Sequence, residues 1–145
     1  MNPDSLFQTA NTLALFAWIF LIIAHKWRWT FKLLIGIIVT ALGLLYAYFI
    51  SKAMTSGMSF ESFGSLDGIV EGFQNKQAAL AGWIHYLAFD LMVGIWIVYN
   101  ASKNQIPFLL ILPCLLGTFM LGPVGLLLYL VIRMIAKKSF FVNYP

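Results

Sequence analysis

The sequence predicts an all-α membrane protein, a bundle of four transmembrane helices with an amphipathic interfacial helix between the second and third. Hydrophobic residues make up 61% of the 145-residue chain and charged residues 10%, against about 25% charged in soluble domains. So short a chain has too much surface to hide that apolar content from water. Four apolar runs each approach the roughly 20 residues that a span needs. Backbone groups in hydrocarbon must bond internally, so the runs are predicted helices of one domain, residues 1–145.

The first two spans are predicted over residues 6–24 and 33–50. The first carries polar residues only in its opening turns, and the second is uncharged. Gly36 and Gly43 lie seven residues apart on one face of the second span. Small residues allow helices to approach closely, so we expect these two glycines to pack against a neighbouring helix.

The connection between the second and third spans is long, and its residues 58–74 alternate in a helical pattern. Apolar residues recur there at spacings of three or four, with acidic residues between them, as in an interfacial amphipathic helix. Ser65 is placed to cap a short helix, with Asp67 in its first turn. Two interpretations stay open: a helix on the membrane surface without chemistry, or a lid over an intramembrane pocket.

The third and fourth spans are predicted over residues 78–99 and 106–132. The fourth is longer than one crossing requires and contains Pro107, Pro113 and Pro123. We therefore expect it to tilt or to break near a proline. Its glycines at 117, 122 and 125 are predicted to pack closely.

The net charge of +4 comes from nine Lys and Arg against five Asp and Glu. The basic residues flank apolar segments, where they are expected to set the membrane topology and to contact lipid headgroups rather than to bind nucleic acid. Four spans place both termini on one side, but the basic residues then divide five against four, so orientation stays open. Residues 1–5 lack a positive signal-peptide region, which favours a bacterial inner membrane; a processed organelle protein is the alternative. The single Cys114 excludes an intrachain disulfide.

Asp90 is the only carboxylate inside an apolar run, and it lies near the middle of the third span. A charged group at that depth is costly and marks a functional site by default. No Lys or Arg lies in the core to pair with it, so we expect a neutral Asp90 bound to hydroxyls. A purely structural hydrogen bond to another helix is the competing interpretation.

His85 is the second candidate catalytic residue, five positions before Asp90. Five residues turn a helix by about 500°, so the two side chains diverge by roughly 140°. Both still face inward if the third span is central. His25, the other histidine, lies at a membrane edge. We therefore predict no haem, no metal site and no cofactor.

Matching depths across the four predicted spans gives a candidate binding layer around His85 and Asp90. Its members are hydroxyl, amide and indole side chains, together with a proline that frees a backbone carbonyl. The layer comprises Asn11, Thr12, Thr40, Trp83, Tyr86, Thr118 and Pro123.

Three stretches of the second half resemble a known family. GSLDGI (64–69), AGWIHYLAFDLMVGIWI (81–97) and IPFLLILPCLLGTFMLGPVGLLLYLVIR (106–133) are similar to the abscisic-acid-deficient-type membrane protein family. The resemblance implies a role linked to forming neoxanthin from violaxanthin. It carries over no catalytic residue, and without a plastid-type extension the chain looks bacterial.

Two functions of different class follow. In the first, the protein is a cofactor-independent isomerase or accessory enzyme for a carotenoid, polyene or terpenoid lipid, with His85 and Asp90 transferring protons. In the second, it is a non-catalytic membrane protein that binds a pigment, a lipid, another membrane protein or a second copy of itself.

Overall fold

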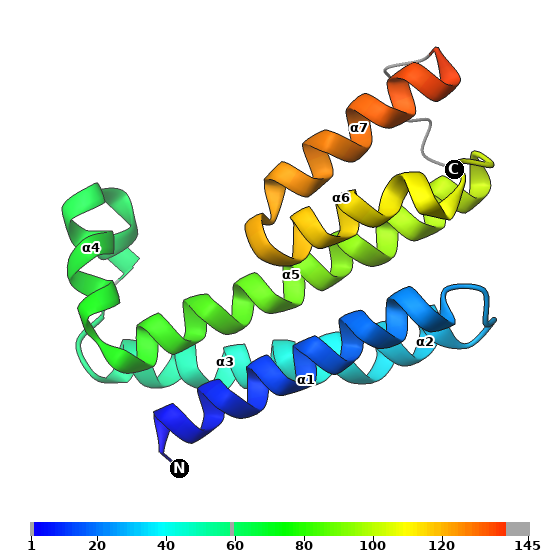
Figure 1. The fold of residues 1–145 in the computed structure, drawn as a ribbon. Coiled ribbons are helices and arrows are strands. Elements are labelled where there is room, and N and C mark those ends of the chain that lie inside the picture. The colour runs from blue at the N-terminus through cyan, green and yellow to red at the C-terminus, as the bar shows by residue number, and fades with distance from the viewer. Residues whose placement is uncertain (1, 59, 139–145) are drawn as a thin grey trace.

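A computed structural model describes residues 2–58 and 60–138, and all regular structure within those ranges is helical (Figure 1). The elements in chain order are α1 (Pro3–Ala24), α2 (Thr30–Leu33), the π-helix η1 (Leu34–Val39), α3 (Thr40–Thr55), the 3₁₀ helix η2 (Phe60–Gly64), α4 (Leu66–Gln74), α5 (Lys76–Lys103), α6 (Phe108–Leu121) and α7 (Pro123–Lys137).

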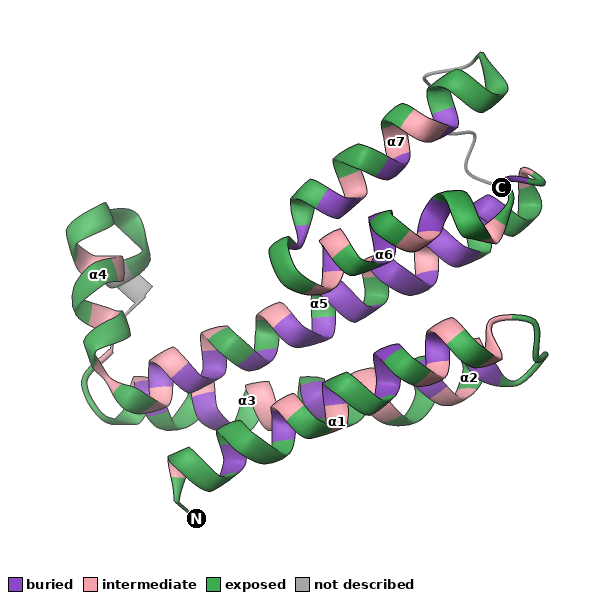
Figure 2. Ribbon diagram, viewed as in Figure 1, coloured by how far each residue is buried: buried purple, intermediate pink, exposed green. Residues whose placement is uncertain are grey.

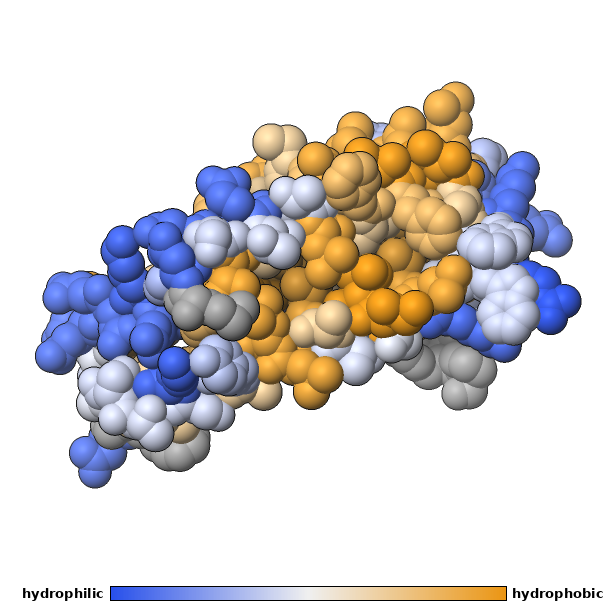
Figure 3. Space-filling model, turned by 90° about the horizontal axis from the view of Figure 1, so that it is seen from below, coloured by the Kyte–Doolittle hydropathy of each residue, from blue (hydrophilic) through white to orange (hydrophobic). Residues whose placement is uncertain are grey.

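Three helices are long and apolar enough to cross a membrane. They are α1 with 22 residues, the continuous helix Thr30–Thr55 with 26, and α5 with 28. Figure 3 shows the matching surface, an apolar belt between hydrophilic ends. The predicted all-helical membrane protein is therefore confirmed, and each span runs a few residues beyond its predicted bounds.

The predicted fourth span is wrong, because the apolar run 106–132 breaks into α6 and α7. Gly122, with φ +50° and ψ −102°, ends α6, and Pro123 starts α7. The 14 residues of α6 and 15 of α7 each extend only about 21–23 Å, less than the roughly 30 Å of hydrocarbon. Figure 1 shows them as a hairpin that returns to the end where it began. The break beside a proline was predicted; the reversal was not.

Glycines let the two arms of this hairpin approach. A Cβ on Gly117 would lie 3.2 Å from the Cα of Gly125, and one on Gly125 would overlap the backbone of Thr118. The predicted close packing of these glycines is confirmed. The same prediction for Gly36 and Gly43 is wrong, because both are exposed with open space where a Cβ would stand.

The central element is α5, which packs against α1, α3, α6 and α7. Figure 2 shows buried positions along most of its length, while the other helices expose broad outer faces. In the most apolar stretch of α5, 56% of the residues are buried, whereas the corresponding fraction in Thr30–Thr55 is 17%. Functional side chains on α5 are therefore held by neighbours on several sides.

The predicted interfacial segment forms η2 and α4, and α4 runs across the axis of α5 (Figure 1). The Oγ of Ser65 accepts a hydrogen bond of 3.1 Å from the N–H of Gly68, so Ser65 caps α4 as predicted. Asp67 lies in the first turn. Phe73 packs on Gly82 of α5, where a Cβ would lie 2.7 Å from the Phe73 ring.

Charge separates between the two ends of the molecule. The basic end contains the α1–α2 turn, the α5–α6 loop and the end of α7 (Figure 1). The acidic end contains the N-terminus of α1, the end of α3, η2, α4 and the start of α5. The basic end carries Lys26, Arg28, Lys32, Lys103, Arg133, Lys137 and Lys138. The acidic end carries Asp4, Glu61, Asp67, Glu71, Lys52 and Lys76.

Candidate functional site

Asp90 lies at the middle of α5, 14 residues after its first residue and 13 before its last. The α6–α7 turn covers it: a Cβ on Gly122 would lie 2.8 Å from the Asp90 Oδ1. Asp90 is 8% exposed, and its buried Oδ2 has no hydrogen-bond partner among the described residues. An unpaired buried carboxyl oxygen is costly, so this position needs an explanation beyond packing.

A strip of aromatic residues on α5 and α1 leads from the acidic end to Asp90. Trp83 lies 5.6 Å from Phe7 and 5.5 Å from Tyr86, measured between ring centroids. The Trp83 indole N–H donates a 2.8 Å hydrogen bond to the Asn11 side-chain oxygen. The Tyr86 hydroxyl interacts with the Asp90 carboxyl. We call Phe7, Trp83 and Tyr86 the aromatic strip.

The helical spacing of three and four residues explains this alignment. Trp83, Tyr86 and Asp90 fall on one face of α5. Trp83 is 41% exposed, so the strip is open along its outer side. The hairpin ends beside Asp90 and does not extend over the strip toward the acidic end (Figure 1).

His85 points away from Asp90, so the expectation that both line one inward cavity is corrected. The His85 ring stacks on Phe89 at 4.5 Å and lies 5.3 Å from Tyr46. It lines a separate cavity of about 250 Å³ between α3, α5 and the η2–α4 segment, whose Phe63 and Phe73 form part of the wall. The physical reason is the 140° divergence, which packing around α5 does not remove.

The remaining residues of the predicted layer are dispersed. Thr12 is exposed, and exposed Thr40 donates a 2.9 Å hydrogen bond to the Ile35 carbonyl of its own helix. Thr118 is buried inside the hairpin, and its hydroxyl donates a 2.8 Å hydrogen bond to the Cys114 carbonyl. Pro123 follows Gly122 at the turn. Of the layer, Asn11, Trp83 and Tyr86 are the residues brought into line with Asp90.

Gly122 is the site residue that the sequence interpretation missed as a partner of Asp90. The signal was present, because Gly-Pro inside an apolar run is a turn signal. A turn at Gly122 brings the start of α7 to the depth of Asp90 instead of the far side of the membrane. The α7 N-terminus adds a partial positive potential beside the carboxyl group.

The arrangement is suited to proton transfer in an apolar medium. A carboxyl group has a donor and an acceptor oxygen when protonated, and desolvation favours that neutral form. No group of three or more His, Cys, Asp or Glu side chains that could hold a metal ion occurs within residues 2–58 and 60–138. The groups at this site that can donate or accept a proton are the Asp90 carboxyl and the Tyr86 phenol.

A comparison with models of known protein families gives a match over most of the chain. A sequence model of the ABA4-like family, described as ABA DEFICIENT 4-like, matches residues 5–129. That match includes all but the first two residues of the three membrane-spanning candidates, together with the interfacial segment, Asp90 and the turn at Gly122. No curated protein and no solved structure matches the chain.

Proposed function

The chain belongs to the ABA4-like (ABA DEFICIENT 4-like) family, and we propose that it is a membrane enzyme isomerising a lipophilic polyene or terpenoid without a cofactor. Asp90 is the proposed proton-transfer residue and Tyr86 its hydroxyl partner. The proposed location is the inner membrane of a bacterium, where the basic end faces the cytoplasm.

The observation that carries the proposal is the unpaired Oδ2 of Asp90 at the centre of the longest helix. A structural aspartic acid would be expected to satisfy both oxygens. A reacting group instead keeps an oxygen available for the substrate. The neighbouring turn shields the carboxyl group from water. In such a site, proton transfer to a lipid-soluble molecule does not compete with proton transfer to solvent.

The proposed reaction converts an epoxide to an allenic alcohol, and one carboxyl group can carry out both of its proton transfers. The protonated oxygen of Asp90 donates its proton to the epoxide oxygen as the C–O bond breaks. The other oxygen accepts the proton that leaves carbon as the allene forms. Electrons are conserved within the substrate, and Asp90 ends protonated as it began, so no cofactor is required.

The aromatic strip supports a polyene as the substrate class. Its rings form a continuous apolar surface from Phe7 to Tyr86, with consecutive centroids separated by 5.6 and 5.5 Å. Asn11 and Tyr86 place polar groups beside it. A rod-shaped substrate in the outer half of the membrane could lie along the strip with its reacting end at Asp90.

The test uses purified full-length protein in nanodiscs with an epoxy-carotenoid. We expect turnover by the wild type, and a loss of at least about a hundredfold for Asp90→Asn, the upper range for one acid–base residue being roughly 10⁴-fold. Asp67→Asn is the matched control, because it makes the same change on exposed α4. Substrate binding without turnover in the wild type supports the alternative, a non-catalytic pigment-binding or partner protein.

A further inference from the structure

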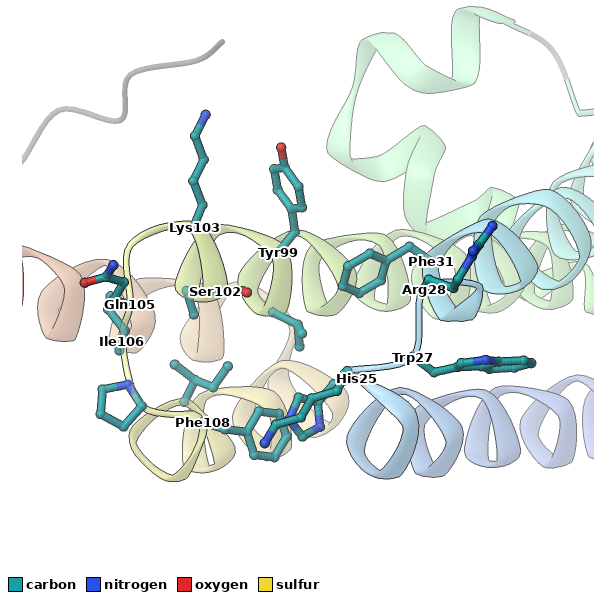
Figure 4. Close-up of a pocket in the computed structure, with 15 residues that line it drawn as sticks. His25, Trp27, Arg28, Phe31, Tyr99, Ser102, Lys103, Gln105, Ile106 and Phe108 are labelled. Atoms are coloured by element: carbon teal, nitrogen blue, oxygen red, sulfur yellow. The ribbon is translucent and has the colours of Figure 1, made fainter.

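A second cavity, unused by the proposed reaction, opens at the basic end. It has a volume of about 880 Å³ and lies between the α1–α2 turn and the α5–α6 loop (Figure 4). That volume is within the range of small-molecule sites, roughly 300–1,000 Å³. The cavity is lined by residues at the final turns of α5, about 12–20 Å along the helix from Asp90.

Aromatic side chains form much of the cavity wall. Phe31, Tyr99 and Phe108 line it, and Figure 4 shows Phe31 and Phe108 between the two connecting segments. Phe31 and Tyr99 contact edge to face at 6.4 Å between centroids. Such a wall is suited to the acyl or prenyl chain of an amphiphile rather than to a small polar metabolite.

Three cations line the cavity, and no carboxylate side chain of the described residues does. Lys26, Arg28 and Lys103 are lining residues. Arg28 and Lys103 extend on the same side of the opening, with Tyr99 between them (Figure 4). None of the five acidic residues of the chain is among the lining residues, so the local charge is uncompensated and attracts an anion.

His25 contributes a polar atom to this site. Its Nδ1 lies 2.9 Å from the Ile22 carbonyl oxygen, which can only accept, so Nδ1 donates this hydrogen bond. The ring stacks on Phe108 at 3.8 Å with an interplanar angle of 3°, which holds it in place. The buried Nε2 has no partner among the described residues and is available to a headgroup hydroxyl.

We propose that this cavity binds an anionic phosphate-bearing amphiphile from the membrane leaflet at the basic end. The phosphate lies at the cationic wall that Lys26, Arg28 and Lys103 contribute, and the apolar chain lies against Phe31 and Phe108. Basic pockets between helices at the cytoplasmic surface fit anionic headgroups. A zwitterionic headgroup is disfavoured because its ammonium would meet three cations.

Native mass spectrometry of the full-length protein in detergent tests the site with three probes: phosphatidylglycerol, phosphatidylcholine and inorganic phosphate. We expect phosphatidylglycerol to bind at least tenfold more tightly than either of the others. Each cation removed should weaken phosphatidylglycerol binding by about fivefold, and Lys26→Gln/Arg28→Gln/Lys103→Gln together by roughly a hundredfold if the effects add.

A matched control separates the cavity from general surface charge. Lys32→Gln/Lys137→Gln/Lys138→Gln removes the same charge from the same end, at exposed positions that do not line the cavity. We expect this variant to bind as the wild type does. An equal loss in both triple variants overturns the proposal, as does equal binding of phosphatidylcholine or inorganic phosphate. If the first triple variant fails to fold, Lys103→Gln alone must still show its fivefold loss.

Discussion

At the scale of single residues, Gly122 and Asp90 constrain each other. Gly122 adopts φ +50°, and any Cβ there would also meet the Asp90 carboxyl at 2.8 Å. We expect Gly122→Ala to lower the free energy of unfolding by about 1–3 kcal/mol, because alanine is strained at this positive φ and its Cβ would crowd the Asp90 carboxyl. Thermal unfolding in detergent measures this, with Gly64→Ala, which has open space, as control. A Gly122→Ala variant as stable as wild type would contradict the observed turn.

His85 provides a residue-scale test of which α5 face is catalytic. Because it lines the cavity under α4 and not the face of Asp90, we expect His85→Gln to leave kcat within about threefold of wild type, well below the 10²–10⁴ of an acid–base residue. The measurement is steady-state turnover in the nanodisc assay. A loss as large as that of Asp90→Asn would restore the sequence-based assignment of both residues to one site.

The sequence identified Asp90 correctly as a buried carboxyl, because an acidic residue inside an otherwise apolar run is rare and easily recognised from sequence alone. It did not identify which side chains face Asp90. Depth matching fixed the height of Thr12 and Thr40 along the membrane but not their direction around the helix axis. Both are exposed, whereas Trp83 and Tyr86, on the helix of Asp90 itself, share its face by simple periodicity.

At the scale of elements, the α6–α7 hairpin depends on contact between its glycines. A Cβ at Gly125 would overlap the backbone of Cys114 and Thr118, which cannot move without opening the hairpin. We expect Gly125→Ala to destabilise by at least about 1–3 kcal/mol, the usual cost of overpacking. Gly43→Ala is the control: it faces open space and should be neutral or gain up to about 1 kcal/mol of helix propensity. Thermal unfolding of both variants distinguishes them.

The α4 segment is expected to lie on one membrane surface. Glu61 and Glu71 are exposed, while native Cys114 is buried, so introduced cysteines can be labelled selectively. Glu61→Cys and Glu71→Cys should both react with an impermeant thiol reagent added to the outside of intact cells. Labelling of the two positions from opposite sides would show that the segment crosses the membrane.

At the scale of the whole molecule, composition and hydropathy were sufficient for the helical membrane fold but not for the number of crossings. The run 106–132 has the length and apolarity of a span, and hydropathy does not detect a reversal inside it. The local geometry of Gly122 decides between one crossing and a hairpin. That single turn changes the side on which every later residue lies.

The reversal predicts the orientation that the sequence left open. With α6 and α7 as a hairpin, seven of the nine Lys and Arg residues gather at the basic end, and four of the five acidic residues at the other. Basic loops remain in the cytoplasm. We therefore expect an outside N-terminus, three crossings and a C-terminus in the cytoplasm, opposite to the shared side that four spans would require.

Reporter fusions at the two termini measure this directly. A reporter active only in the cytoplasm should be active at the C-terminus, and one active only outside should be active at the N-terminus. The double variant Lys137→Gln/Lys138→Gln still leaves five cations at the basic end. We therefore expect it to keep the wild-type topology. If both termini report the same compartment, α6 and α7 together cross the membrane, and Gly122 can no longer lie beside Asp90 as a returning turn.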